Sequence, residues 1–105
     1  MNDRIFPADA DTRSAEAVVR DLVIVNRKGL HARATAKFVQ CCERYEAEIT
    51  VSKCGDTVGG SSIMGILTLG AAQGSTITVT ASGRQANEAI EALAQLVGNR
   101  FGEEE

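Results

Sequence analysis

The chain has 105 residues, of which 44% are hydrophobic, enough for one small domain with a single core. Its formal net charge is −3, whereas general nucleic-acid binders usually carry a basic face. No apolar run is long enough to span a membrane, and the acidic N-terminus is unlike a signal peptide. We therefore expect a cytoplasmic protein that binds neither nucleic acid nor membrane.

The three cysteines bear on metal and redox chemistry. Cys41 and Cys42 are adjacent and Cys54 is distant, which matches no common zinc-binding spacing. We expect three free thiols that serve packing, with no metal site and no cofactor. A metal or redox protein built on these cysteines and His31 is disfavoured by the same spacing.

The two ends of the chain differ in composition from its middle. Residues 1–17 contain the only proline and few large apolar side chains, which is typical of a flexible extension. β-branched residues begin at position 18, and the last apolar periodicity ends near position 98. We predict an N-terminal extension over 1–17, a domain over 18–98 and an acidic tail over 99–105.

The domain begins with a strand pattern and then a helix pattern. β-branched residues over 18–25 predict a strand with Leu22 and Ile24 facing the core. Apolar side chains then recur at helical spacing among good helix formers, which predicts a helix over 32–45.

A hairpin and an ambiguous segment follow. Alternating residues over 47–52, a turn and a short run at 57–59 predict two antiparallel strands. The segment 61–70 has the composition of a buried strand, but its leading serine and final glycine are typical of helix caps. We favour a short helix there.

The last two elements complete the fold prediction. Residues 75–81 alternate with Ile77 and Val79 on one face, and residues 84–97 form an amphipathic helix pattern. The order is β-α-β-β-α-β-α, with strands that are apolar on one face only. This predicts an α+β open-faced β-sandwich, with a four-stranded antiparallel sheet and three helices on one face.

The only histidine, His31, lies where the first strand gives way to the first helix. A neutral imidazole can attack a phosphoryl group, and the unpaired N–H groups of a first helical turn attract anions. Here those groups belong to Ala32, Arg33 and Ala34, and the Arg33 guanidinium can fold back onto an oxyanion. The sequence has no nucleotide-binding loop and no second histidine, so donor and acceptor would be partner proteins.

These residues resemble HPr, the histidine-containing phosphocarrier family of the bacterial phosphoenolpyruvate-dependent phosphotransferase system. Residues 29–33, Gly-Leu-His-Ala-Arg, are similar to the family's active-site signature. Residues 62–70, Ser-Ile-Met-Gly-Ile-Leu-Thr-Leu-Gly, resemble its regulatory-serine segment. The likeness runs from about 22 to 97 and leaves 1–17 outside it.

The resemblance implies a monomeric carrier rather than a stand-alone enzyme. Enzyme I would phosphorylate His31 at Nδ1, Arg33 would hold the phosphoryl oxygens, and an EIIA-type protein would accept the group. The residues of the partner-binding surface would be Ala36, Ile63, Met64 and Leu67.

Two features of this segment have alternative interpretations. Ser62 would be the target of an HPr kinase/phosphorylase by resemblance, but it is equally explained as a plain helix cap. Ile63, Met64 and Leu67 could pack in the core, although so many apolar residues on one short helix predict that at least one is exposed. The alternative function is a regulatory module that binds partners through this surface without obligatory phosphotransfer.

One residue departs from the family pattern, because Ala34 stands where the family usually has proline. Alanine adds an N–H donor and leaves the first helical turn looser. We expect phosphotransfer to survive this departure. The acidic, extended chain with Ser62 suits, by resemblance, the nitrogen-related branch or a Gram-negative system with a serine kinase.

Overall fold

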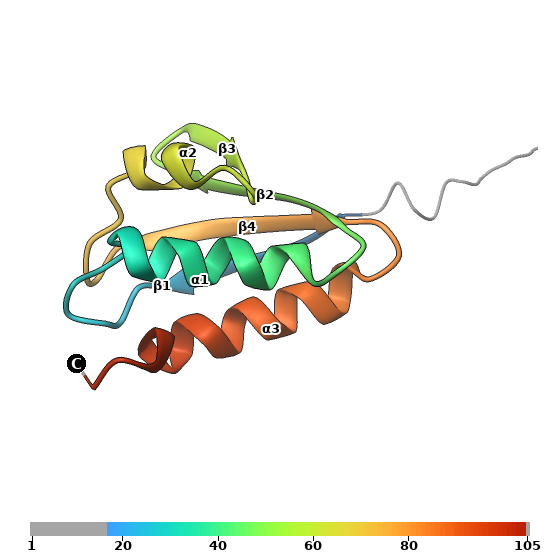
Figure 1. The fold of residues 1–105 in the computed structure, drawn as a ribbon. Coiled ribbons are helices and arrows are strands. Elements are labelled where there is room, and N and C mark those ends of the chain that lie inside the picture. The colour runs from blue at the N-terminus through green and yellow to red at the C-terminus, as the bar shows by residue number, and fades with distance from the viewer. Residues whose placement is uncertain (1–16, 105) are drawn as a thin grey trace, which may run out of the picture.

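The computed structural model describes residues 17–104, which form an antiparallel sheet covered by helices on one face (Figure 1). The predicted extension over 1–17 therefore lies, except for Ala17, outside the described residues, as does Glu105. The elements are β1 Ala17–Val23, α1 Ala32–Glu43, β2 Glu48–Lys53, β3 Asp56–Gly59, α2 Ile63–Thr68, β4 Thr76–Ser82, α3 Ala86–Gly98 and the short 3-10 turn η2 Arg100–Gly102. The predicted α+β open-faced sandwich is confirmed, with all its strands and helices.

The sheet has the strand order β1-β4-β2-β3, so β4 pairs with both β1 and β2. Leu22 lies opposite Ile77, and Val51 lies opposite Val79. All four side chains are buried under the helices. The register therefore places the apolar residues of three strands on one face, and the other face is open and rich in threonine.

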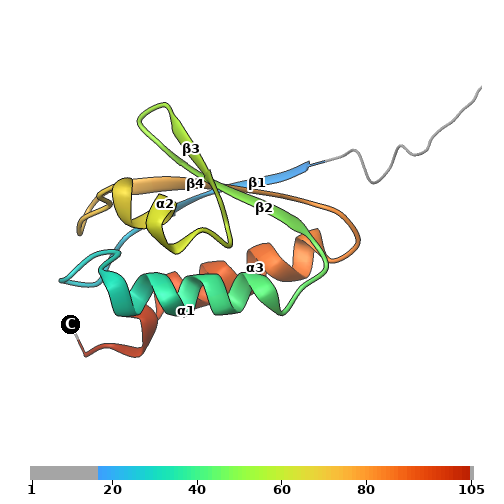
Figure 2. The same cartoon turned by 45° about the horizontal axis from the view of Figure 1, so that its top comes forward.

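Helices α1 and α3 lie side by side across the covered face of the sheet (Figure 2). Phe38 of α1 and Ile90 and Leu93 of α3 are almost completely excluded from solvent. Burial of each such side chain contributes about 1.5–3 kcal/mol, so this layer supplies much of the stability.

Element ends differ from the predicted ones where distant contacts decide them. Ile24 lies beyond the end of β1 but is fully buried, as predicted. Helix α3 begins two residues later than predicted: Gln85 is its N-cap, with non-helical φ and ψ of −112° and 32°, and the Gln85 N–H donates to the Glu46 carbonyl at 2.9 Å. No local periodicity records such a contact.

The ambiguous segment 61–70 contains the helix α2, as favoured from the sequence, so its interpretation as a buried strand is wrong. Ser62 is the N-cap of α2, and its Oγ accepts the Gly65 N–H at 3.0 Å. Such a cap contributes about 1 kcal/mol. Gly70 ends the segment with φ of +64°, which a glycine adopts without strain.

The three cysteines are free thiols, as predicted. Cys41 and Cys42 are buried on α1, and burial raises the pKa of Cys42 to about 12. Cys54 is exposed in the hairpin turn, so the expectation that it serves packing is wrong. Within residues 17–104, no three histidine, cysteine or acidic side chains are grouped to hold a metal. No helix in this part of the chain is long and apolar enough to cross a membrane.

Candidate active site

The turn between β1 and α1 presents His31, and Gly29 gives the turn its shape. Gly29 has φ of +69°, and a Cβ there would lie only 2.6 Å from the Ala71 carbonyl oxygen. The next residue, Leu30, donates its N–H to that same oxygen at 2.9 Å. The turn is thus held against the loop before β4, and only glycine fits without moving one of the two segments.

His31 is the N-cap of α1, with extended φ and ψ of −74° and 179°. Its carbonyl accepts the first helical hydrogen bond, from the Thr35 N–H at 2.8 Å. The N–H groups of Ala32, Arg33 and Ala34 therefore have no partner within the helix. Together with the helix dipole, they favour negative charge beside the imidazole.

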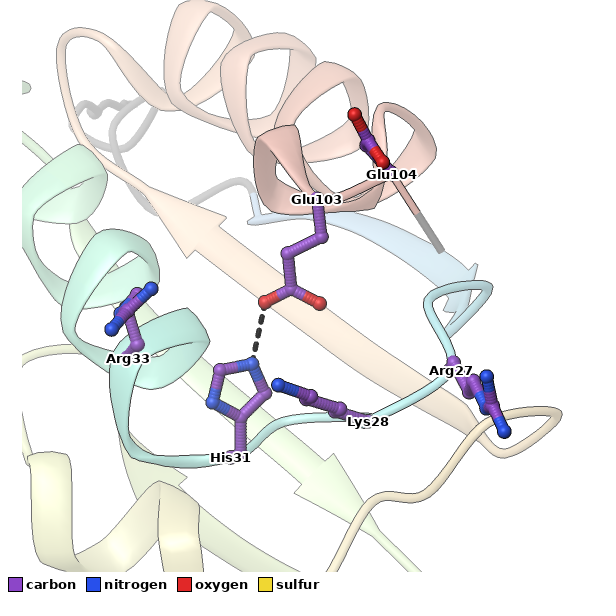
Figure 3. Close-up of a pocket in the computed structure, with 6 residues that line it drawn as sticks. All are labelled: Arg27, Lys28, His31, Arg33, Glu103 and Glu104. Atoms are coloured by element: carbon purple, nitrogen blue, oxygen red, sulfur yellow. Dashed lines mark hydrogen bonds and ion pairs between the residues drawn. The ribbon is translucent and has the colours of Figure 1, made fainter.

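The imidazole of His31 contacts a carboxylate from the other end of the chain. Its Nε2 lies 2.5 Å from Oε2 of Glu103, which follows α3 and the η2 turn (Figure 3). The two side chains are 28% and 21% exposed, so the pair is partly shielded from water. Within the described residues the imidazole has no other hydrogen bond, which leaves Nδ1 available.

Asn26 links this carboxylate to the turn. Its side chain is fully buried, and Nδ2 donates to the Gly29 carbonyl at 2.9 Å and to Glu103 Oε1 at 3.0 Å. The hydrogen bond from Asn26, followed by that from His31, lowers the pKa of Glu103 below its ordinary value. Glu103 is therefore ionised at neutral pH and can only accept hydrogen bonds.

Basic side chains surround this pair in a depression of about 460 Å³. Arg27, Lys28 and Arg33 line it together with His31, Glu103 and Glu104 (Figure 3). The Arg33 side chain is exposed and forms no hydrogen bond or ion pair with any residue between 17 and 104. The structure thus places Arg33 at the same depression as His31, without a direct bond between them.

The predicted partner surface is partly exposed. Ile63 and Met64 are 42% and 70% exposed on α2, whereas Ile66 of the same helix is buried. This confirms that the apolar residues of α2 do not all face the core. Leu67 and Ala36 are half-buried, and α2 packs against α1.

Sequence reasoning missed Glu103 and Asn26, because the end of the chain was interpreted only as an acidic tail. Phe101, between α3 and Glu103, is 1% exposed, and its carbonyl accepts a hydrogen bond from Lys37 Nζ at 2.6 Å. A lone aromatic residue in a polar segment was the available signal that this part of the chain packs on the domain. The burial of Asn26 has no comparable signal in the sequence.

Comparisons with known protein sequences identify the family. Residues 18–99 match the sequence model of the PTS-HPr family, described as "PTS HPr component phosphorylation site". Phosphocarrier protein HPr of Cupriavidus necator is 44% identical over 86 residues, which cover 82% of this chain and 97% of that protein. Phosphocarrier protein HPr of Xylella fastidiosa is 43% identical over 84 residues, which cover 80% of this chain and 94% of that protein.

Solved structures show the same fold. HPr-C-His from Thermoanaerobacter tengcongensis superposes with a TM-score of 0.81 at 41% identity, covering 84% of this chain and 99% of its own. HPr from Bacillus anthracis superposes with a TM-score of 0.74 at 44% identity, and the match covers 77% of this chain and 96% of that one. With the family model matching residues 18–99, which include the histidine turn, the chain belongs to the HPr phosphocarrier family of the phosphotransferase system.

Proposed function

We propose that this protein accepts a phosphoryl group from Enzyme I on His31 and passes it to an EIIA-type protein. The observation that supports this most directly is the position of His31. The chain's only histidine caps a helix N-terminus inside a basic depression, and its Nδ1 has no hydrogen bond to the described residues. These are the features that a nucleophile for phosphate needs.

In the proposed transfer step, Nδ1 of His31 attacks the phosphoryl group. The Nδ1 lone pair forms a bond to phosphorus, and the bond from phosphorus to the donor breaks with its electron pair leaving on the donor. The free N–H groups at the start of α1 and the guanidinium of Arg33 offset the negative charge on the phosphoryl oxygens. The return step, to an acceptor, is the same reaction in reverse.

Partners would dock beside the histidine, on the surface formed by Ala36, Ile63, Met64 and Leu67. Ile63 and Met64 are exposed and apolar on α2, which packs against α1, and the first turn of α1 carries His31 and Arg33 at the depression. Such a surface suits a transient partner with an acidic rim. We propose that the protein works as a cytoplasmic monomer, without a cofactor.

Ser62 is the proposed site of regulation, by an HPr kinase/phosphorylase. It is exposed and caps α2 immediately before Ile63 and Met64. A phosphoserine adds nearly two negative charges at a helix N-terminus, which the helix itself tolerates. The added charge would instead weaken docking of an acidic partner.

Incubation with Enzyme I and phosphoenolpyruvate tests the proposal. We expect one acid-labile phosphate per chain in the wild type and in Ser62→Ala, and none in His31→Ala. Acid-stable phosphate on Ser62 as the only modification, with cellular function unaffected by His31→Ala, would instead support a purely regulatory binding module.

A further inference from the structure

We propose that Glu103, held in place by Asn26, is a positioning residue that keeps the proton of the His31 imidazole on Nε2. This inference rests on the proposed phosphotransfer, because it explains how Nδ1 is made ready as the nucleophile. It also concerns a part of the chain, after α3, to which the sequence assigned no function.

The hydrogen-bond directions fix the tautomer. Glu103 Oε2 faces His31 Nε2 at 2.5 Å, and Glu103 Oε1 accepts from Asn26 Nδ2 at 3.0 Å. An ionised carboxylate has no proton to donate, so the shared hydrogen belongs to Nε2. In a neutral imidazole only one nitrogen carries hydrogen, so Nδ1 keeps its lone pair. In Figure 3 this second ring nitrogen lies on the side of the ring nearer α1.

Asn26 binds the carboxylate directly, and the buried Phe101 fixes the segment that carries it. The Asn26 side chain is buried, and its single NH₂ group binds both Glu103 and the Gly29 carbonyl, two residues before His31. Phe101 is buried two residues before Glu103, and its carbonyl accepts from Lys37 Nζ. The carboxylate and the histidine turn are therefore fastened to one another and to α1.

The same arrangement serves the charged intermediate. When Nδ1 forms its bond to phosphorus, the proton on Nε2 stays in place and the ring becomes positively charged. Glu103 is already bound to that nitrogen and offsets the charge without moving. The carboxylate contacts the ring through Nε2 only, which leaves Nδ1 to the phosphoryl group.

Glu103→Gln tests this role, because the variant keeps the size of the side chain but offers one acceptor oxygen where two are needed. The readout is the tautomer of His31, measured by long-range ¹H–¹⁵N NMR correlations of the neutral ring. His31 is the only histidine, so the signals are unambiguous. Glu104→Gln is the matched control, since Glu104 carries the same charge and points away from the imidazole (Figure 3).

We expect the wild type and Glu104→Gln to carry the proton on Nε2 alone. Glu103→Gln should show a mixture of both tautomers and accept phosphate about tenfold more slowly, the size expected for one charge-assisted hydrogen bond. Thermal unfolding of both variants shows whether the fold is retained, and Glu103→Ala repeats the test with no acceptor at all.

The two proposals fail in different ways. A wild-type tautomer and a wild-type rate in both Glu103 variants would overturn the positioning role and leave phosphotransfer intact. Absence of phosphate on wild-type His31, with the tautomer shift still seen in Glu103→Gln, would overturn the proposed function and leave the positioning of the ring established.

Discussion

Individual residues at this site depend on contacts between distant parts of the chain. His31 and Arg33 were predicted as site residues because their neighbours along the chain form a helix start. Glu103 and Asn26 could not be found in that way, since the carboxylate lies 72 residues from the histidine it contacts. Local patterns indicate a candidate nucleophile, but the residues that contact it come together only in the folded arrangement.

The contact of Glu103 predicts a specific pH dependence of stability. Hydrogen bonds from Asn26 and His31 lower the pKa of Glu103 in the folded protein. The unfolded chain therefore binds the proton first as pH falls, so the contact stabilises the fold fully above the ordinary glutamate value of about 4.3 and progressively less below it.

Urea unfolding of the wild type and Glu103→Gln between pH 3 and pH 7 measures this effect. We expect the wild type to be more stable near pH 5, and its margin over Glu103→Gln to shrink as the pH falls further. Glu104→Gln should show no such change. A margin that stays constant down to pH 3 would contradict the predicted direction.

Ala34 gives a second prediction at the residue scale. Its N–H lies in the first turn of α1, before the first helical hydrogen bond, so proline there removes no bond of the helix. We expect Ala34→Pro to fold and to accept phosphate at a rate within about tenfold of the wild type, a change of roughly 1.4 kcal/mol. Complete loss of phosphate acceptance in a folded variant would show that the Ala34 N–H is essential.

At the level of elements, sequence periodicity correctly predicted which segments form strands and which form helices. The strand with Ile77 and Val79 and the helix around Leu93 follow from spacing alone, because each buries one face. The ends of elements were less predictable. At the start of α3, for example, the N-cap Gln85 contacts Glu46, a residue far from it in sequence.

Gly29, in the turn before α1, can be compared with Gly55, in the turn between β2 and β3. Gly29 and Gly55 both have positive φ, at +69° and +88°, but only Gly29 lies against other backbone atoms. We expect Gly55→Ala to lose about 1–2 kcal/mol from the strained backbone alone. Gly29→Ala should lose about 1–3 kcal/mol more, because the loop containing Ala71 must move.

Denaturant unfolding measures both losses, and phosphate acceptance shows their effect on the site. Because Gly29 lies two residues before His31, its substitution should also slow phosphorylation, whereas Gly55→Ala should leave the rate unchanged. Equal losses of stability in the two variants would mean that the contact with Ala71 does not constrain the turn.

Helix α1 also predicts which thiols react. Burial raises the pKa of both Cys41 and Cys42, and that of Cys42 to about 12, so neither forms the reactive thiolate readily. Cys54 is exposed. We expect iodoacetamide at pH 8 to modify Cys54 alone in the native protein and all three cysteines in guanidinium chloride. Modification of Cys42 under native conditions would show that α1 opens readily.

On the scale of the whole molecule, the fold concentrates several features at one end of the sheet. The histidine turn meets the segment after α3 there, and α2 packs against α1 nearby, although these parts are separate in the sequence (Figures 1 and 2). The chain is acidic overall, with a net charge of −3, yet Arg27, Lys28 and Arg33 gather around His31, and Glu103 and Glu104 offset only part of their charge. The sequence already predicted an anion site at the helix start beside His31, and the fold adds Arg27 and Lys28 to it.

A pulse–chase experiment tests the carrier function most directly. The protein is labelled with phosphoenolpyruvate and Enzyme I, separated from both, and then mixed with an EIIA-type acceptor. We predict that one acid-labile phosphate on His31 leaves the chain and appears on the acceptor. Phosphate that is never acquired at His31, or that remains there in the presence of functional acceptors, would contradict the account.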